Sequence, residues 1–176
     1  SLMMSEDVQS LLYTGRFYDD GNPAECHNGA LVVQGAIEDH SVYDGLKDPN
    51  VHKITAPAAD TDEVHVVDYV DVSHGEIMGV MYREGIKTYG ISAPAGADIR
   101  VRIPAKYDTG YFAEENFATP PTVGQYAIPT ANSTLWTPSA SKVTDKTCIK
   151  IEYEKAVTEG MVHSGKEYFV TFVNVM

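Results

Sequence analysis

The chain has few cysteines and no long apolar run among its 176 residues. Its two cysteines, Cys26 and Cys148, are too few for a disulfide framework or a structural zinc site, and we expect two free thiols rather than one bridge. The lack of about 18 consecutive apolar residues excludes a transmembrane helix. Since no basic segment precedes an apolar one near the start, we expect no secretory signal and an intracellular folding compartment.

Basic residues are also scarce. The chain carries 13 Lys and Arg against 25 Asp and Glu, which gives a formal net charge of −12. Such a field repels phosphate backbones and anionic lipid, so neither nucleic acid nor a membrane surface is an expected partner. A stable partner should offer a basic or neutral patch, or should bind mainly through apolar contacts.

Helical periodicity is rare, and alternation of apolar and polar residues dominates. Residues 99–103 are the clearest half-buried strand, because apolar side chains at the odd positions alternate with Arg100 and Arg102. Gly and Pro recur roughly every ten residues, the turn spacing of a sandwich or barrel. The sequence therefore predicts a mainly β fold, an antiparallel sandwich or barrel-like, with at most one or two short helices.

Two hairpins are expected in the second half of the chain. Residues 149–154 alternate and 168–175 are β-branched and aromatic, so these two segments should pair antiparallel. A second hairpin is expected over 125–136, turning at 130–133. The best helix candidate is 108–117, with Asp108 or Thr109 as its cap.

The first half should supply the remaining strands. Short apolar runs at 30–33 and 51–55 predict two of them. The segment 63–72 should form another, with Val64 and Val66 on one side and His65 and Val67 on the other.

One domain is expected over residues 21–176, after a turn at 19–23. Residues 1–20 should be separate from it. Ser1 and Leu2 precede Met3 and are expected to be an expression remnant. The rest should be an extended arm that becomes ordered on a partner, with a short helix over 5–12 as the alternative.

Residues that could carry chemistry are scattered. His74 and Glu76 share one face of a strand and could both contact a metal, but no third ligand is visible. Cys26 and His27 are sequence neighbours, which point in opposite directions on an extended chain. The acidic cluster 60–63 lacks a calcium-loop pattern and predicts a solvated loop. We therefore expect no catalytic, cofactor or metal site; the six histidines are at positions 27, 40, 52, 65, 74 and 163.

Aromatic residues are the remaining resource, with 11 Tyr, five Phe and one Trp. Exposed aromatic rings provide large contact area at low entropic cost, which suits recognition surfaces. Tyr126 and Trp136, on the arms of the second expected hairpin, could form such a surface for sugar or protein. The favoured alternative is that the aromatic residues fill the core or pair across strands.

The order of these features resembles small head proteins of tailed bacteriophages, described as decoration or capsid-stabilising proteins and encoded near the major capsid protein. The similarity is carried by the GALV strand of 28–35, the strand ending in Ala-Pro at 51–58, the Val-rich strand 64–72, and the segments 96–102, 111–117 and 121–126. The resemblance implies a β-rich accessory that binds an assembled shell and often forms small oligomers. It implies no catalytic residues.

These observations predict a non-enzymatic structural protein of a phage or prophage virion, assembled in the bacterial host cytoplasm. Its expected partner is the capsid protein or a second copy of itself. A first alternative is a binding module of a cell surface or phage tail that recognises glycan or protein through exposed aromatic residues. A second is a metal-dependent enzyme whose site is assembled from scattered residues such as His74 and Glu76.

Overall fold

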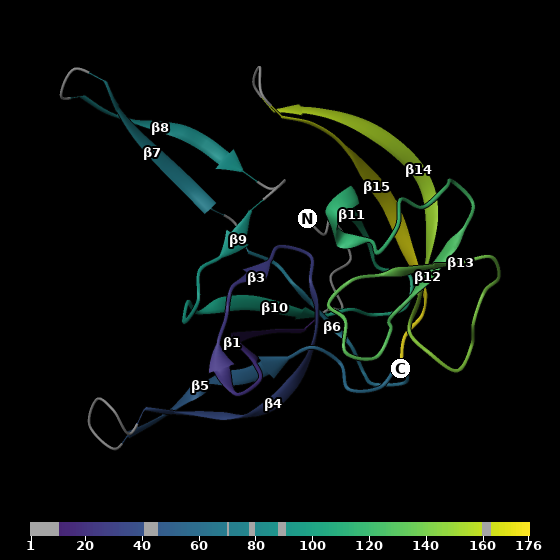
Figure 1. Ribbon diagram of the computed structural model, residues 1–176, viewed down its shortest axis with the longest axis horizontal. Helices are drawn as coiled ribbons and strands as arrows, with labels where there is room; N and C mark the ends of the chain where they lie inside the picture. The colour runs from purple at the N-terminus through teal and green to yellow at the C-terminus, as the bar shows by residue number, and fades with distance from the viewer. Residues whose placement is uncertain (1–10, 41–45, 70, 78–79, 88–90, 160–162) are drawn as a thin grey trace.

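The computed structural model describes residues 11–40, 46–69, 71–77, 80–87, 91–159 and 163–176, some of them by backbone alone. Strands account for almost all of its regular structure, which confirms the predicted mainly β fold (Figure 1). Over these ranges the helical structure is a single 3₁₀ turn, η1 (Glu114–Asn116). No helix in the described part is long and apolar enough to cross a membrane.

The first half of the chain forms a closed barrel. Six strands form one sheet in the order β10-β6-β4-β5-β1-β2. Because β10 also pairs with β1, the first five strands of this order close into a barrel. The closing pair is antiparallel, whereas β1 and β5 run parallel. The strands are β1 (Leu11–Asp19), β2 (Asn22–Pro23), β4 (Leu31–His40), β5 (Leu46–Thr55), β6 (His65–Val67) and β10 (Ile99–Ile103).

Mostly small and aliphatic side chains fill the barrel, together with the aromatic ring of Phe17. Val32, Ile99 and Val101 are at most 1% exposed and belong to one buried cluster with Ile54. The narrow interior explains Gly15 on β1, because a Cβ at that position would lie 2.8 Å from a side-chain carbon of Ile54. The alternation predicted for 99–103 is thus confirmed.

The second half of the chain forms an open sheet in the order β11-β15-β14-β12-β13. Its long central hairpin confirms the pairing predicted between 149–154 and 168–175. The first arm of the other predicted hairpin, 126–128, is a strand, but it pairs with 137–139 and not with residues before 136 as predicted, and the connection covers 129–136. The strands are β11 (Thr109–Ala113), β12 (Tyr126–Ile128), β13 (Thr137–Ser139), β14 (Cys148–Glu159) and β15 (His163–Asn174).

The open sheet packs against the outside of the barrel, and β4 and β6 take part in both cores. Leu31 and Val66 join the aromatic cluster beneath the sheet, while their neighbours Val32 and Val67 point into the barrel. Val64 also joins the aromatic cluster, so the two sides predicted for Val64, Val66 and Val67 are confirmed. Burial on both faces explains why these segments are continuous apolar runs.

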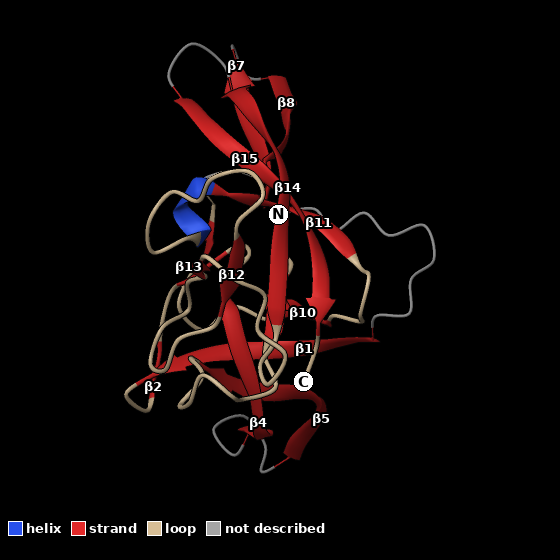
Figure 2. Cartoon of the chain, turned by 90° about the vertical axis from the view of Figure 1, so that its right-hand side faces the viewer, coloured by secondary structure: helices blue, strands red, loops and turns tan. Residues whose placement is uncertain are grey.

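Long hairpins project from this body. The hairpin of β7 (Asp71–Ile77) and β8 (Val80–Lys87) extends from the same end of the molecule as the far part of β14–β15, and β4–β5 extends from the opposite end (Figures 1 and 2). A short pair, β3 (Cys26–His27) with β9 (Ser92–Ala93), lies where β7–β8 leaves the barrel.

Two sequence predictions need correction. Residues 11–19, assigned to an arm or short helix, are barrel strand β1, whose partners 99–103 and 51–54 are too distant in sequence for a local pattern to show. The helix predicted over 108–117 is wrong. Strand β11 occupies 109–113, because Phe112 turns into the aromatic core while Tyr111 turns outward, and the 3₁₀ turn η1 occupies 114–116. The part of the predicted arm before residue 11 lies outside the described residues.

Candidate functional site

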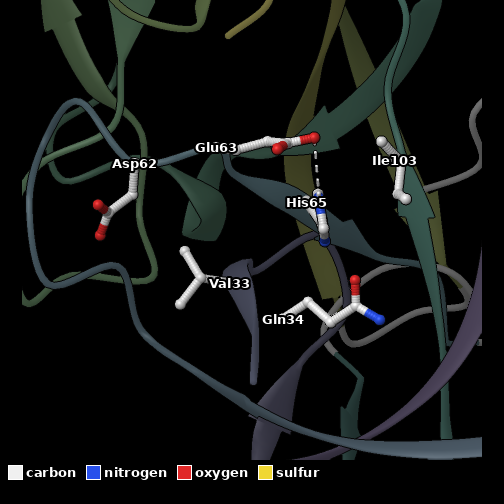
Figure 3. A pocket seen from close by; sticks show the side chains of 6 residues that line it. All are labelled: Val33, Gln34, Asp62, Glu63, His65 and Ile103. Atoms are coloured by element: carbon white, nitrogen blue, oxygen red, sulfur yellow. Dashed lines mark ion pairs between the residues drawn. The ribbon is translucent and has the colours of Figure 1, made fainter. Parts of the chain in front are cut away.

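A recess opens at the rim of the barrel, where the start of β4, the loop before β6 and the end of β10 meet (Figure 3). Its volume is about 380 Å³, near the lower end of the range for small-molecule sites, ~300–1,000 Å³. Its lining combines two apolar side chains with four polar ones: Val33, Ile103, Gln34, Asp62, Glu63 and His65.

His65 forms the floor of this rim recess and is only 4% exposed. Its Nδ1 is 2.7 Å from the hydroxyl of Tyr13, and the two rings meet edge to face. Burial lowers the pKa of His65, although the neighbouring Glu63 carboxylate acts in the opposite direction. Burial also raises the pKa of Tyr13. Both groups are therefore neutral at neutral pH, and the hydroxyl can donate to Nδ1 or accept from it.

The second ring nitrogen of His65, Nε2, has no hydrogen-bond partner among the described residues and lies only at ion-pair distance from Glu63, as the dashed line in Figure 3 marks. Nε2 is buried, and the nearest carboxylate oxygen, Oε1 of Glu63, is 3.7 Å away. This separation is too long for a hydrogen bond. Figure 3 shows the Glu63 carboxylate above the ring, on the opposite side from Gln34. Asp62 is held in place because one carboxylate oxygen accepts the backbone N–H of Ala59 at 2.9 Å.

The recess can bind polar groups through two carboxylates, one amide and one imidazole, and its lining includes no Ser, Thr, Cys or Lys side chain. Across the described residues, no group of three His, Cys, Asp or Glu side chains is placed to hold a metal ion. No known protein family, curated protein or solved structure matches this chain.

A second feature lies on the outward face of the open sheet. Three aromatic rings from adjacent strands form a cluster there, which we call the outer aromatic cluster: Tyr111, Tyr153 and Phe169. Tyr153 and Phe169 stack at 4.8 Å with an interplanar angle of 18°, and Tyr111 lies 5.1 Å from Phe169. The hydroxyls of Tyr111 and Tyr153 are hydrogen-bonded. Tyr153 is 43% exposed, so this cluster faces solvent.

The pair proposed from sequence as a recognition surface is not one. Trp136 is fully buried in the aromatic core, edge to face with Phe112 and Phe172. Tyr126 is half-buried on β12, beside Lys150 and Ser139. The surface interpretation of Trp136 is therefore wrong, and the core alternative is correct. A lone Trp in a β protein is the largest available side chain for the space between two packed layers.

The other candidate residues are also separated. Cys26 and Cys148 are both buried free thiols, and burial raises the pKa of Cys26 to about 12. His27 points away from Cys26 to bond the hydroxyl of Ser92 through Nδ1 at 2.7 Å. The acidic segment 60–63 is a loop, as predicted, with Asp60 paired to Lys146. The side chains of His40, His74, Glu76 and His163 lie outside the described part.

Sequence reasoning missed both surface features. The alternation of 63–67 predicts that His65 and Val67 share a face. The sequence also predicts an arm for the segment that contains Tyr13, so it does not predict the contact of Tyr13 with His65. The outer aromatic cluster depends on a register shift that the alternation of the sequence does not reveal: between Ile151 and Tyr153 the pairing shifts by one residue, so Tyr153 lies opposite Phe169 on the outward face. Because the sequence predicts a helix over 108–117, it does not place Tyr111 on a strand of this sheet.

Proposed function

We propose that this chain is a non-enzymatic structural protein of a phage or prophage particle that binds the exterior of the capsid shell. The observation that carries the proposal is the outer aromatic cluster of Tyr111, Tyr153 and Phe169 on the solvent side of the open sheet. The resemblance of the sequence to tailed-phage head proteins supplies the class of partner.

The cluster is suited to docking because it is already organised. An antiparallel sheet with one face on a core normally has polar residues on the other face. Here the stacked rings of Tyr153 and Phe169 and the hydroxyl contact of Tyr111 fix the side chains before any partner arrives. Prior ordering reduces the entropy lost on binding, and Tyr and Phe are enriched at protein interfaces.

The charge of the chain supports the same choice of partner. A net charge of −12 disfavours contact with packaged DNA and favours a neutral or basic protein surface. Lys155 lies over the ring of Tyr111 at 5.8 Å, so the rim of the cluster also carries polar groups. An aromatic centre with a polar rim is the usual composition of an interface between separately folded proteins.

A co-sedimentation experiment tests the proposal. Purified protein is mixed with phage heads that lack it and then centrifuged, and the bound fraction is measured over a range of protein concentrations. The Tyr153→Ala variant should bind about tenfold or more weakly, because removing an interface hot spot costs about 2 kcal/mol. Its matched control is Leu12→Ala, since Leu12 is 52% exposed on the barrel, away from the cluster.

The outcomes separate the partners. Binding that Tyr153→Ala weakens and Leu12→Ala preserves supports docking through the open sheet. If both variants bind like the parent, the cluster is not the contact surface. The third outcome is that the protein does not co-sediment with the heads, and that Tyr153→Ala converts an oligomer into a monomer in sedimentation velocity. The partner is then a second copy of the chain, and shell binding is refuted.

A further inference from the structure

The rim recess has a set of polar groups that share one property. Each of the four polar side chains that line it can accept a hydrogen bond: the carboxylates of Asp62 and Glu63, the amide oxygen of Gln34, and Nε2 of neutral His65. Two carboxylates beside a neutral imidazole leave the recess negatively charged. A ligand that fits it must therefore be rich in donors and positively charged.

Nε2 of His65 supplies an independent indication. The side chain of His65 is 5% exposed, yet Nε2 has no hydrogen-bond partner among the described residues and faces Glu63 across 3.7 Å. A buried polar atom without a partner costs about 1–3 kcal/mol. In the tautomer that carries its proton on Nδ1, His65 donates to the hydroxyl of Tyr13, and Nε2 is free to accept from an N–H group that enters the recess and also contacts the Glu63 carboxylate.

The apolar walls define the rest of the ligand. Val33 and Ile103 are half-buried and border the same recess, so they can contact a short aliphatic stem. Glu63 has a 62% exposed side chain, so the mouth of the recess is open to solvent. The nearby Lys146 is bound to Asp60 and not to these two carboxylates.

We propose that the rim recess binds an alkyl-guanidinium or alkyl-ammonium group, whose N–H donors contact Glu63, Asp62 and Nε2 of His65 and whose stem lies against Val33 and Ile103. The group can come from an arginine or lysine of another protein or from a free organic cation. This site goes beyond the proposed function, because it lies on the barrel and does not require the outer aromatic cluster.

The experiment is a titration of the ¹⁵N-labelled full chain followed by ¹H–¹⁵N correlation spectra. The probes are N-acetyl-arginine N-methylamide, which presents arginine as it occurs within a chain, and butylguanidinium, which presents the group alone. N-acetyl-citrulline N-methylamide is the neutral isostere. We expect both cations to shift the amides of Val33, Gln34, Glu63 and His65, and the citrulline probe to leave them unchanged at the same concentrations.

A pair of variants tests the carboxylate. Glu63→Gln should weaken binding of the arginine probe about tenfold or more, because it removes a charge-assisted hydrogen bond. Glu25→Gln changes the net charge equally, but Glu25 follows β2 at the far end of β1 from Tyr13, so it should have no effect.

Each outcome decides something. Binding of both cations supports the site with a protein side chain as a source, and binding of butylguanidinium alone supports the site with a free cation as the source. Equal binding of citrulline, an unchanged affinity in Glu63→Gln, or shifts located elsewhere would each overturn the proposal.

Discussion

The barrel and the open sheet differ in the side chains that fill their cores and cover their outer surfaces. Inside the barrel the buried side chains are mostly small and aliphatic, with Phe17 among them, and its outer surface carries ion pairs such as Arg16 with Asp98 at 2.6 Å. Beneath the open sheet the core is aromatic, and its outer surface carries more aromatic rings. The difference follows from the space available. A closed barrel of few strands leaves a narrow interior, whereas a sheet lying on a barrel encloses a broader gap.

The two regions also differ in their exposed groups. Charged groups on the barrel exterior are largely paired with each other, as Arg16 is with Asp98 and Arg102 with Asp68. Among the described residues of the barrel, single buried atoms of Arg16, Glu38, His65 and Asp68 lack a hydrogen-bond partner, and of these only Nε2 of His65 belongs to the lining of the rim recess. The outer face of the open sheet has no requirement to support the core, yet it holds stacked rings. The two proposals therefore assign different ligands to the two regions, a small cation to the barrel rim and a protein to the sheet.

The largest effect should come from the aromatic core. Phe112 contacts the rings of Phe117, Trp136 and Phe172 and is fully buried. Phe112→Ala should lower the free energy of unfolding by about 3–5 kcal/mol, through lost transfer energy and a residual cavity. Urea denaturation measures it. Val101→Ala, in the barrel, removes fewer buried carbons and should cost about 2 kcal/mol; an equal loss for both would contradict the contrast between the cores.

A smaller effect should come from the charged exterior of the barrel. Asp68 is 2% exposed and pairs with Arg102 at 2.6 Å and with Arg100 at 2.8 Å. Asp68→Ala leaves the half-buried guanidinium of Arg102 without its carboxylate, so we expect a loss of about 3 kcal/mol in unfolding free energy. Asp98→Ala breaks an exposed pair and should cost less than about 1 kcal/mol by the same measurement. Similar costs would show that burial of Asp68 adds nothing.

The connection between the two regions should contribute less again. Asn116 is fully buried; its Oδ1 accepts the N–H of Ala113, and its Nδ2 donates to the carbonyl of Asn28 at 2.7 Å. Asn116→Ala orphans both backbone groups and should cost about 2 kcal/mol, measured by thermal and urea unfolding. Gly29, with a φ of +83°, packs against this amide and leaves no room for a Cβ. The exposed Asn22→Ala is the control and should be neutral; a neutral Asn116→Ala would show that apolar contact alone joins the two regions.

The smallest effect should appear as a pH dependence at the barrel rim. The pKa of His65 is lower in the folded chain than its ordinary value of 6.5. Below that pH the unfolded chain takes up a proton that the folded chain resists, so stability should fall as the pH drops from 7.5 to 5.5, by about 1 kcal/mol. The urea midpoint of His65→Gln should lose part of this dependence, whereas His27→Gln, at an exposed histidine, should keep all of it.

Local patterns in the sequence predicted the strands that alternate, such as 99–103 and the long C-terminal hairpin, because period-two alternation reflects burial of one face. They could not predict which strands meet across the chain. Strand β1 joins residues 92 positions away, as Leu11 pairs with Ile103, and both Tyr13 and the rim recess depend on that pairing. Trp136 shows the reverse case, since an aromatic residue next to a turn gives no local sign of which layer will cover it.

The order of the strands has a consequence for synthesis. All the barrel strands end by residue 103, and the open sheet begins at 109, so the barrel can close while the later half is still on the ribosome. At that moment the barrel has an exposed apolar stripe on its outer surface, formed by Leu31, Val64 and Val66. The nascent chain therefore exposes an apolar surface until β14 and β15 emerge and pack onto the barrel. During that interval we expect the barrel to be prone to aggregation with other nascent copies.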